Sequence, residues 1–473
     1  MKSHPYLLLS FFSCFLVLNV FSQQPNYSIL LIPPALKENA NATIRESVIE
    51  ITILAVDRML VKQKRVVTVF NKLGNGYASL EKQYNNDTKI KGLVAKVYNQ
   101  FGKEIKKYSK RKFLDASVFD GFSLYSDARK KHINYTPTEY PYTMVFESEH
   151  ETSSTGFIPS WYPTSGYYVS VEKSSYQLNN PLKIPVRLKE NNFDGFAIEN
   201  SSSEFDLKYE LQNFSAVEYE RDAQYFIDFM PRLQVAINDF ALKKVKGSVS
   251  NWNEFGKWMY SNLLVGRDHL DLNTKIKIKA LVKDVENPID RAKIVYEFMQ
   301  QKTRYISVQV GIGGWSPIPA NIVDKVGYGD CKGLTNYTKA LLDAADVTSY
   351  YTVVNADEQI DIDAEFASIQ GNHVFLNIPN NGKDVWLECT SQTTPFGFLG
   401  RFTDDRDVLV ITPEGGMMKH TPAYLNETNL QHTKAFIELD EKGNATASLE
   451  RISKGIQYDD KYLFETISDE DLI

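Results

Sequence analysis

Hydrophobic and polar positions in the first half of the chain follow the short period that is typical of β-strands. Residues 47–53 and 66–70 are rich in β-branched side chains. Asn75 and Gly76 supply turn chemistry, since both residue types accept a positive φ at low cost. Comparable strand-like runs are found at 90–98, 142–148, 167–171 and 204–211. We therefore predict an antiparallel β-sandwich over residues 23–215, in which Asp115–Lys131 is a loop and no catalytic constellation is recognised.

The period lengthens after about Val217, and residues 216–250 are interpreted as a linker. Apolar residues at helical spacing lie between Trp252 and Leu263, and again between Leu334 and Ala344. Asn287 followed by Pro288 is a typical helix start, because the asparagine can cap the helix and proline suits the first turn. The aromatic and methionine side chains of these stripes are interpreted as core, since such stripes pack far more often than they bind ligands.

Strand patterns return at residues 349–354, 372–378 and 384–389, and Asn380–Gly382 supplies a hairpin turn between the last two. Helices followed by an antiparallel sheet predict a core domain over residues 251–413. Residues 433–439 and 445–452 then predict the start of a C-terminal β domain over 414–473, which we expect to be incomplete because so short a unit cannot bury its own core. The predicted fold class is α+β.

Charge and cysteine content narrow the classes of function. The 473 residues include 53 Lys and Arg against 59 Asp and Glu, and this net charge of −6 argues against a general nucleic-acid binder. The three cysteines, Cys14, Cys331 and Cys389, are too few for a disulfide scaffold, and no cysteine–histidine cluster has the spacing of a zinc site. We expect neither a metal nor an organic cofactor.

The first 22 residues have the pattern of a secretory signal peptide. Lys2 precedes an apolar run over residues 6–21, and Val20 and Ser22 are the small residues that a signal peptidase requires. Cleavage after Ser22 would remove Cys14. A lipoprotein acylated at Cys14 and an uncleaved anchor are the less favoured alternatives. The sequence thus predicts an exported protein of the periplasm, the cell envelope or the medium.

Cys331 lies where a glycine-rich segment, residues 327–333, meets a predicted helix. A helix N-terminus favours negative charge and so favours the thiolate, which is the nucleophilic form of cysteine. The backbone N–H groups there can also stabilise a developing oxyanion. Asp330 stands at the N-cap position and is interpreted as the helix cap.

A thiol nucleophile also needs a base and a group that orients the base. His373 begins one predicted strand and Glu388 lies on the next. A hairpin that turns at Asn380–Gly382 places the two almost directly opposite each other. Cys389, adjacent to Glu388, points to the other face of the strand and is interpreted as packing.

These motifs resemble the bacterial transglutaminase-like superfamily: Gly-Asp-Cys-Lys-Gly before a helix, Asn-His-Val opening a strand, and Trp-Leu-Glu with a threonine two residues on. The whole chain resembles exported, Bacteroidetes-type members with an N-terminal β-sandwich domain of unknown function. The resemblance implies a papain-like core with Cys331 as nucleophile, His373 as base and Glu388 as the acidic member, where aspartate is commoner. It also implies that Tyr305 and Trp315 line the substrate groove.

Simpler interpretations compete with each assignment. Cys331 could be a packing residue or form a disulfide with Cys389, Glu388 could be a solvated strand residue, and Trp315 is equally well explained as core. The hypothesis that joins the residues is an exported thiol enzyme that cleaves amide bonds of a protein or peptide substrate through a thioester, as a peptidase or amidase, or that cross-links proteins. The alternative is an inactive peptide- or glycan-binding scaffold of the cell envelope.

Overall fold

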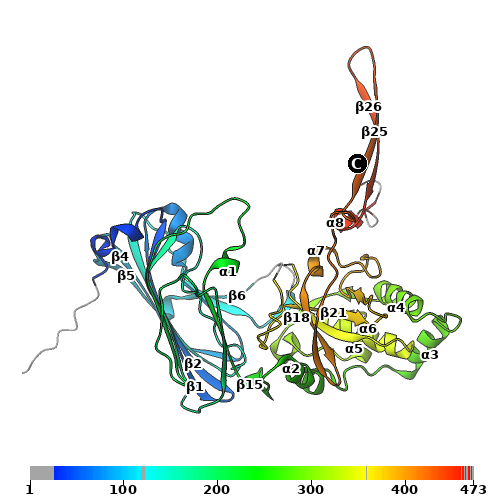
Figure 1. Ribbon diagram of the computed structural model, residues 1–473, viewed down its shortest axis with the longest axis horizontal. Coiled ribbons are helices and arrows are strands. Elements are labelled where there is room, and N and C mark those ends of the chain that lie inside the picture. Colours follow the sequence, from blue (N-terminus) through cyan, green and yellow to red (C-terminus); the bar gives the residue numbers. More distant parts are fainter. Residues whose placement is uncertain are drawn as a thin grey trace, which may run out of the picture.

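The computed structural model describes residues 26–118, 123–357 and 360–459, together with residues 461, 462, 464, 467, 468 and 470. Two bodies lie side by side, an N-terminal one built of sheets and a second one in which helices pack on a smaller sheet, and a hairpin projects away from the second (Figure 1). The predicted signal peptide, residues 1–22, and Phe119–Phe122 of the predicted loop lie outside the described residues.

The N-terminal body is organised on an eight-stranded sheet, which is antiparallel except for the parallel pair β1 and β10. Its strands, in spatial order, are β12 (Ile198–Asn200), β13 (Leu207–Phe214), β10 (Val169–Asn179), β1 (Ala42–Ala55), β2 (Arg58–Val69), β9 (Tyr142–Thr152), β4 (Thr88–Asn99) and β5 (Glu104–Ser109). Each of the strand-like runs recognised in this part of the sequence overlaps one of these strands, although the runs 66–70, 167–171 and 204–211 extend one to three residues beyond them. Around Asn75 the chain forms a 3₁₀ helix, Lys72–Ala78, in place of a tight turn.

Two smaller sheets cover one face of this large sheet and complete a sandwich. They are formed by β3 (Glu81–Tyr84), β8 (Arg129–His132) and β6 (Leu114–Ser117), and by β11 (Val186–Asn191) with β14 (Arg232–Ile237). Met59, Val61 and Val67 of β2 are buried on the covered face, whereas Lys62 and Lys64 alternate with them. Asp115–Lys131, predicted as a loop, therefore contributes three short strands, the third being β7 (Ser123–Ser126).

Residues 216–250, predicted as a linker, belong largely to the N-terminal body. Strand β14 pairs with β11 over six residue pairs, from Val186 with Ile237 to Asn191 with Arg232. The same stretch contains α1 (Phe226–Phe229) and the hairpin of β15 (Asp239–Leu242) and β16 (Val245–Ser248). The alternation of buried Leu233, Val235 and Ile237 was present in the sequence, so the linker interpretation was wrong there.

The second body combines helices with a five-stranded antiparallel sheet, and this confirms the α+β class. The helices are α2 (Trp252–Met259), α3 (Leu272–Leu281), α4 (Pro288–Lys302), α5 (Ala320–Val326), α6 (Cys331–Ala344) and α7 (Gly400–Thr403). The sheet has the order β22 (Val385–Leu387), β21 (His373–Ile378), β20 (Tyr350–Val354), β23 (Asp407–Thr412) and β24 (Gly415–His420). As predicted, Asn287 caps α4, and its side chain accepts a hydrogen bond from the Ile289 N–H at 2.8 Å.

The predicted domain boundary at residue 413 falls inside this sheet, in the turn between β23 and β24. Gly415 and Gly416 mark a close approach of backbones and not a linker. A Cβ on Gly256 of α2 would lie 2.2 Å from the Cα of Gly416, so neither position can carry a side chain without separating helix and strand. The core therefore extends to His420.

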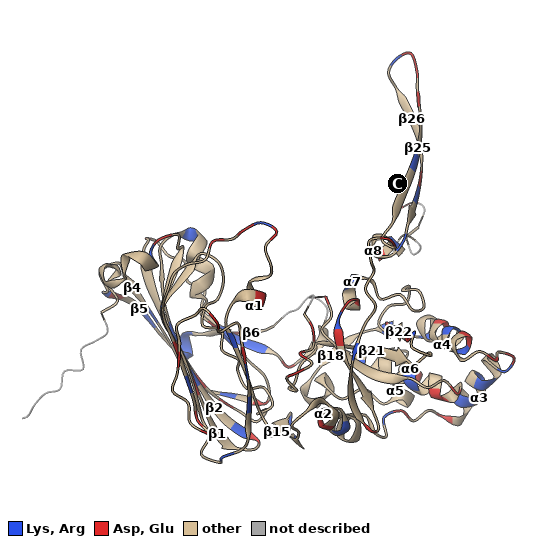
Figure 2. Cartoon of the chain, viewed as in Figure 1, with Lys and Arg blue, Asp and Glu red and all other residues tan. Residues whose placement is uncertain are grey.

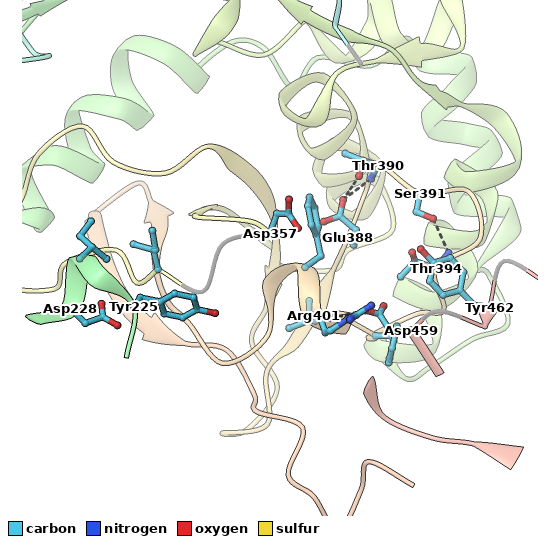
Figure 3. Close-up of a pocket in the computed structure, with 15 residues that line it drawn as sticks. Tyr225, Asp228, Asp357, Glu388, Thr390, Ser391, Thr394, Arg401, Asp459 and Tyr462 are labelled. Atoms are coloured by element: carbon cyan, nitrogen blue, oxygen red, sulfur yellow. Dashed lines mark hydrogen bonds and ion pairs between the residues drawn. The ribbon is translucent and has the colours of Figure 1, made fainter. Parts of the chain in front are cut away.

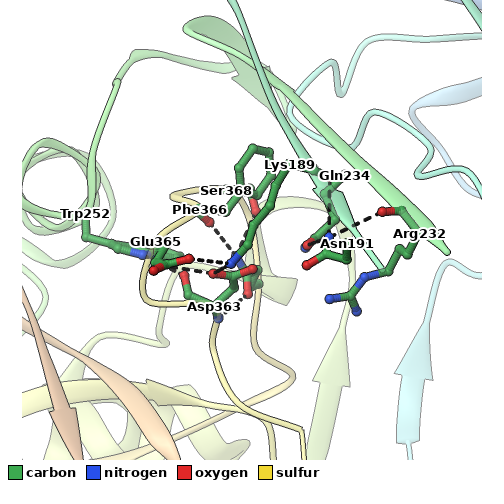
Figure 4. A network of polar contacts seen from close by, with 10 residues as sticks. Lys189, Asn191, Arg232, Gln234, Trp252, Asp363, Glu365, Phe366 and Ser368 are labelled. Carbon is green, nitrogen blue, oxygen red and sulfur yellow. Dashed lines mark hydrogen bonds and ion pairs between the residues drawn. The ribbon is translucent and has the colours of Figure 1, made fainter. Parts of the chain in front are cut away.

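A continuous hydrophobic cluster joins the two bodies. It runs from Tyr176 and Leu233 of the N-terminal sheets through Trp258 to Cys331 and Val353 of the core. Polar contacts reinforce the junction: Lys189 of β11 forms ion pairs with Asp363 at 2.8 Å and with Glu365 at 3.0 Å (Figure 4). The two bodies are thus packed against each other and not merely tethered.

The C-terminal part consists of the hairpin of β25 (Gln431–Leu439) and β26 (Ala445–Ser453), followed by α8 (Ile456–Asp459). Acidic and basic residues are interspersed over both bodies and this hairpin (Figure 2). In the part of the chain that the structure describes, no helix has both the length and the apolarity needed to cross a membrane.

Candidate active site

Cys331 is the first residue of α6, as the sequence predicts, and is buried with 4% of its surface exposed. The helix starts here because the Asp330 side chain accepts a hydrogen bond from the N–H of Gly333 at 2.8 Å. The absence of a side chain at Gly333 leaves room for this cap, because a Cβ there would crowd the Asp330 carboxylate at 3.3 Å. The thiol is therefore held at the positive end of the helix dipole.

His373 is positioned by the turn that leads into β21. Gly371 has a φ of +89°, and a Cβ on it would lie 2.4 Å from Val353, so only glycine fits this approach to β20. The Asn372 side chain accepts a hydrogen bond from the Ala356 N–H at 2.7 Å and donates one to the Ala356 carbonyl at 3.1 Å. These contacts fix the backbone on which the imidazole is mounted.

The imidazole Nε2 of His373 lies 2.8 Å from Oε2 of Glu388. The other carboxylate oxygen of Glu388 accepts hydrogen bonds from the Thr390 N–H at 2.9 Å and the Thr390 hydroxyl at 2.5 Å. The Cys331 thiol is the other polar neighbour of the imidazole and contributes to the raised pKa of His373. The structure thus brings together all three residues that the sequence singles out.

The strand register differs from the predicted one by two residues. β21 pairs with β22 through Leu376 with Leu387 and Ile378 with Val385, which centres the hairpin one position further along the chain than Asn380–Asn381. Glu388 is therefore diagonal to His373 and not directly opposite. A shift of two keeps the side chains on the same face, whereas a shift of one would have separated them.

Burial and charge act against each other on this pair. Desolvation disfavours the imidazolium most strongly, but the Glu388 carboxylate and the hydrogen bonds to Cys331 and Glu388 together raise the pKa of His373 to about 10. Burial likewise opposes the Glu388 anion, yet His373 and Thr390 bring the pKa of Glu388 below its usual value. The pair is held as imidazolium and carboxylate at neutral pH.

Sequence reasoning missed a second ion pair beside the thiol. Lys332 and Asp330 are both buried, and the lysine Nζ lies 2.6 Å from the Asp330 carboxylate and 3.9 Å from the Cys331 sulfur. The lysine ammonium thus neutralises the buried Asp330 carboxylate next to the Cys331 sulfur. Lys332 is part of the Gly-Asp-Cys-Lys-Gly motif, but a lysine in the first turn of a helix is usually solvated, so the sequence alone did not indicate a buried ion pair.

Cys331 and His373 line a cavity of about 240 Å³. Trp315 lines it as well and also packs against Phe157 of the N-terminal body, with ring centroids 5.6 Å apart, so the groove and the packing interpretations both describe it. Tyr305 is not among the lining residues. It pairs with Gly329, two residues before Cys331, and burial together with the neighbouring Cys331 raises its pKa to about 12.

Glu388 lines a second, larger cavity of about 1,100 Å³ (Figure 3). Its wall includes Thr390, the Arg401–Asp459 ion pair and Phe402. The Phe402 ring packs edge-on against the His373 imidazole with centroids 5.0 Å apart and so separates the histidine from this space. The catalytic candidates therefore lie between a small cavity and a large one.

Cys389 is fully buried in a different hydrophobic cluster from Cys331, and both thiols are free. The structure therefore contains no Cys331–Cys389 disulfide. Burial, with a smaller contribution from Glu388, raises the pKa of Cys389 to about 12. This thiol is the packing residue that strand alternation predicts.

One group of described residues has the composition of a metal site: Asp361, Asp407 and His420, whose donor atoms lie within 4.8 Å of one another. Both imidazole nitrogens of His420 are already engaged, one with Asp407 at 2.8 Å and the other with Asp405 at 3.0 Å. These partners raise the pKa of His420, which favours the protonated imidazole, and that form cannot ligate a metal.

One protein-family model matches part of the N-terminal body. Residues 57–217 match the family DUF3857, a domain of unknown function with a solved structure, and this stretch spans β2 to β13 of the N-terminal body. No curated protein matches the chain in sequence.

A solved structure shares the fold. A crystal structure of a putative protease from Parabacteroides distasonis superimposes with a TM-score of 0.56 at 14% identity, over 81% of this chain and 72% of that one. A putative cysteine protease from Cytophaga hutchinsonii matches over 84% of this chain and 90% of that one at 8% identity, with a TM-score of 0.22. At such identity the first likeness establishes the fold alone.

Proposed function

We propose that this protein is a transglutaminase-like thiol enzyme that acts on amide bonds, with a peptidase or amidase activity as the main reaction. The observation that carries the proposal is that His373 shares a cavity with Cys331 and has its Nε2 2.8 Å from the Glu388 carboxylate. A nucleophile, a base and a group that orients the base are the parts that covalent amide chemistry requires.

In the proposed reaction the Cys331 sulfur attacks the carbonyl carbon of the substrate. The carbonyl π electrons move to oxygen, and the backbone N–H groups at the start of α6 stabilise that oxyanion. When the intermediate collapses, the bond from carbon to nitrogen breaks and His373 donates its proton to the leaving amine. A thioester on Cys331 remains.

Neutral His373 then takes a proton from the attacking water, and hydroxide addition to the thioester releases the carboxylic acid and restores the thiolate and imidazolium. An amine in place of water would give a new amide, which is the cross-linking reaction. Glu388 stays ionised throughout and orients the imidazole, as the acidic group does in other triads. The longer side chain of glutamate compared with aspartate spans the diagonal from residue 388 to residue 373.

The alternative is an inactive scaffold that binds peptides or glycans in the same groove. A binding module has no need of an ionised histidine between a thiol and a carboxylate, so the complete set favours an enzyme. Export is a further part of the proposal and rests on the sequence of residues 1–22.

The decisive experiment compares the native protein with Cys331→Ala and with a matched control, Cys389→Ala. Each is incubated with a casein digest with and without a primary amine, and new termini, released ammonia and incorporated amine are measured by mass spectrometry. We expect Cys331→Ala to lose the activity by at least about 10³-fold and Cys389→Ala to retain it. Equal activity of the native protein and Cys331→Ala would overturn the proposal, and incorporation of the amine would identify cross-linking.

A further inference from the structure

The cavity that contains the thiol is not formed by the core alone. Among its lining residues are Asp127, which follows β7, and Lys243, which lies in the turn between β15 and β16. Both belong to the N-terminal body. The domain of unknown function and the strands that follow it therefore supply part of the wall around Cys331.

Asp127 is held in place by strand pairing between the two bodies. β7 pairs in parallel with β18 (Ser307–Gln309) of the core, and the Asp127 N–H donates to the Gln309 carbonyl at 3.4 Å. The Ser123 and Ser307 hydroxyls lie 2.9 Å apart at the start of the same pair. The position of this carboxylate is thus set by a backbone ladder and not by a free loop.

The other charges around the cavity are paired. The Lys243 ammonium lies 2.6 Å from Asp87, and both side chains are about nine-tenths buried. Lys332 is paired with Asp330 at 2.6 Å. Among the described residues, the Asp127 carboxylate accepts one hydrogen bond, of 3.4 Å from the Asn86 N–H, and no cation there lies within ion-pair distance of it. The unmatched charge of the wall is therefore negative.

We propose that this cavity selects acyl donors that carry a protonated amine next to the reacting carbonyl, and that Asp127 is the specificity residue that binds this amine. The volume of about 240 Å³ lies below the roughly 300 Å³ at which ligand pockets begin. The cation must therefore belong to the residue that bears the reacting carbonyl or to its immediate neighbour. Trp315, which lines the same cavity, adds an aromatic face, and aromatic faces attract cations.

Two kinds of substrate offer this chemistry: a peptide with a free N-terminus near the reacting bond, and a peptide with a lysine or arginine side chain there. This inference names the substrate class for the proposed function. It rests on the proposed function only where turnover of a substrate is measured. Binding of the cation in the cavity can be measured without any reaction, because the occupant shields the Cys331 thiol.

The first experiment measures protection of Cys331 from iodoacetamide, read by peptide mass spectrometry, with Cys389 as the internal reference. The probes are Nα-acetyl-lysinamide, with a side-chain cation, alaninamide, with an N-terminal cation, and the neutral isostere Nα-acetyl-norleucinamide. We expect at least one cation to protect at a concentration roughly 10- to 100-fold lower than the neutral probe does. Which one protects identifies the source of the amine.

The variants Asp127→Asn and Asp127→Lys test the residue, and Asp222→Asn, an exposed aspartate of the same body, is the matched control. We expect Asp127→Asn to reduce the preference to within about threefold and Asp127→Lys to reverse it, while Asp222→Asn keeps it. In turnover assays of the corresponding peptides, Asp127→Asn should raise KM for the cationic ones by a larger factor than for the neutral one. A cation preference that persists in Asp127→Asn, or that the native protein lacks, overturns the inference. If Cys331→Ala is as active as the native protein, only the proposed function fails.

Discussion

The N-terminal body and the core each bury one histidine on a strand of their main sheet. The pKa values of these two histidines are shifted in opposite directions. His150 of β9 and His373 of β21 are equally buried, each with 9% of its surface exposed. Burial, and then repulsion from Lys82, lowers the pKa of His150 to about 4. Burial acts on His373 as well, but the Glu388 carboxylate and the Cys331 thiol raise its pKa to about 10.

The difference shows that the partner of a buried histidine, and not its burial, decides whether it carries chemistry. His150 is neutral at physiological pH, and its Nδ1 has no hydrogen-bond partner in the described part of the chain. It fills space between sheets. His373 is held as the imidazolium beside the Cys331 thiol and the Glu388 carboxylate, which is the state that the proposed amide cleavage needs.

The largest expected effect comes from removing the anionic partner of His373, so that this histidine, like His150, is buried without one. Glu388→Gln removes the anion and keeps the size of the side chain. We expect kcat/KM to fall roughly 10²- to 10⁴-fold, because the amide can stabilise the wrong imidazole tautomer. The pKa of His373 should also fall, since burial then acts with less opposition, so the alkaline limb of the pH–rate profile should move to lower pH.

The same variant has a signature in stability. Because the folded-state pKa of His373 is raised, its ion pair contributes fully below the unfolded value of about 6.5 and is lost as pH rises through about 10. The difference in unfolding free energy between the native protein and Glu388→Gln should therefore shrink from pH 6 to pH 10. Glu365→Gln, at an exposed glutamate, is the control. An unmoved alkaline limb would show that Glu388 does not set the titration of His373.

His150 should have a smaller effect on the free energy of unfolding, and its dependence on pH should be opposite to that of His373. The folded-state pKa of His150 is depressed, so its contribution is present above about pH 6.5 and is lost as pH falls toward about 4. The shift corresponds to at most about 3 kcal/mol. We expect His150→Leu to lose less stability than the native protein in urea unfolding between pH 7 and pH 4.5.

His432 of the exposed hairpin offers a matched control, because His432→Leu removes a histidine that is not buried. Its unfolding should follow the native protein at each pH. If His150→Leu shows the same acid sensitivity as the native protein, the buried imidazole is not its source.

The sequence predicts the core site well because the signals there are local. The cap at Asp330, the helix start at Cys331 and the same-face relation of His373 and Glu388 depend on residues close in sequence and on strand parity. The register was wrong by two because it depends on the six-residue loop 379–384, whose turn the Asn-Gly pair alone does not determine. Because a shift of two residues keeps His373 and Glu388 on the same face of the sheet, the predicted site was still formed by the right residues.

The share of the N-terminal body in the site could not be predicted. Ser123 and Ser307 are separated by 184 positions, and the parallel pairing of β7 with β18 leaves no local pattern that would connect them. The predicted domain boundary at residue 413 was wrong for the same reason, since the backbone that Gly416 approaches, at Gly256, is distant in sequence. Local sequence patterns predict secondary-structure elements and which of their faces are buried. Contacts between the two bodies can be identified only from the three-dimensional structure.

The smallest expected effect concerns the junction that lets the two regions share a site. Lys189→Met removes the ion pairs with Asp363 and Glu365 while keeping an apolar stem of similar length. Because such partly exposed pairs are weak, we expect a loss of at most about 1 kcal/mol, and an increase in iodoacetamide labelling of Cys331 of no more than about fivefold. Lys173→Met, which breaks the pair with Glu210 inside the N-terminal sheet, removes the same kind of contact without touching the core. Labelling should rise only in Lys189→Met. An equal rise in both variants would mean that stability alone protects the thiol, whereas a rise confined to Lys189→Met means that docking of the N-terminal body protects it.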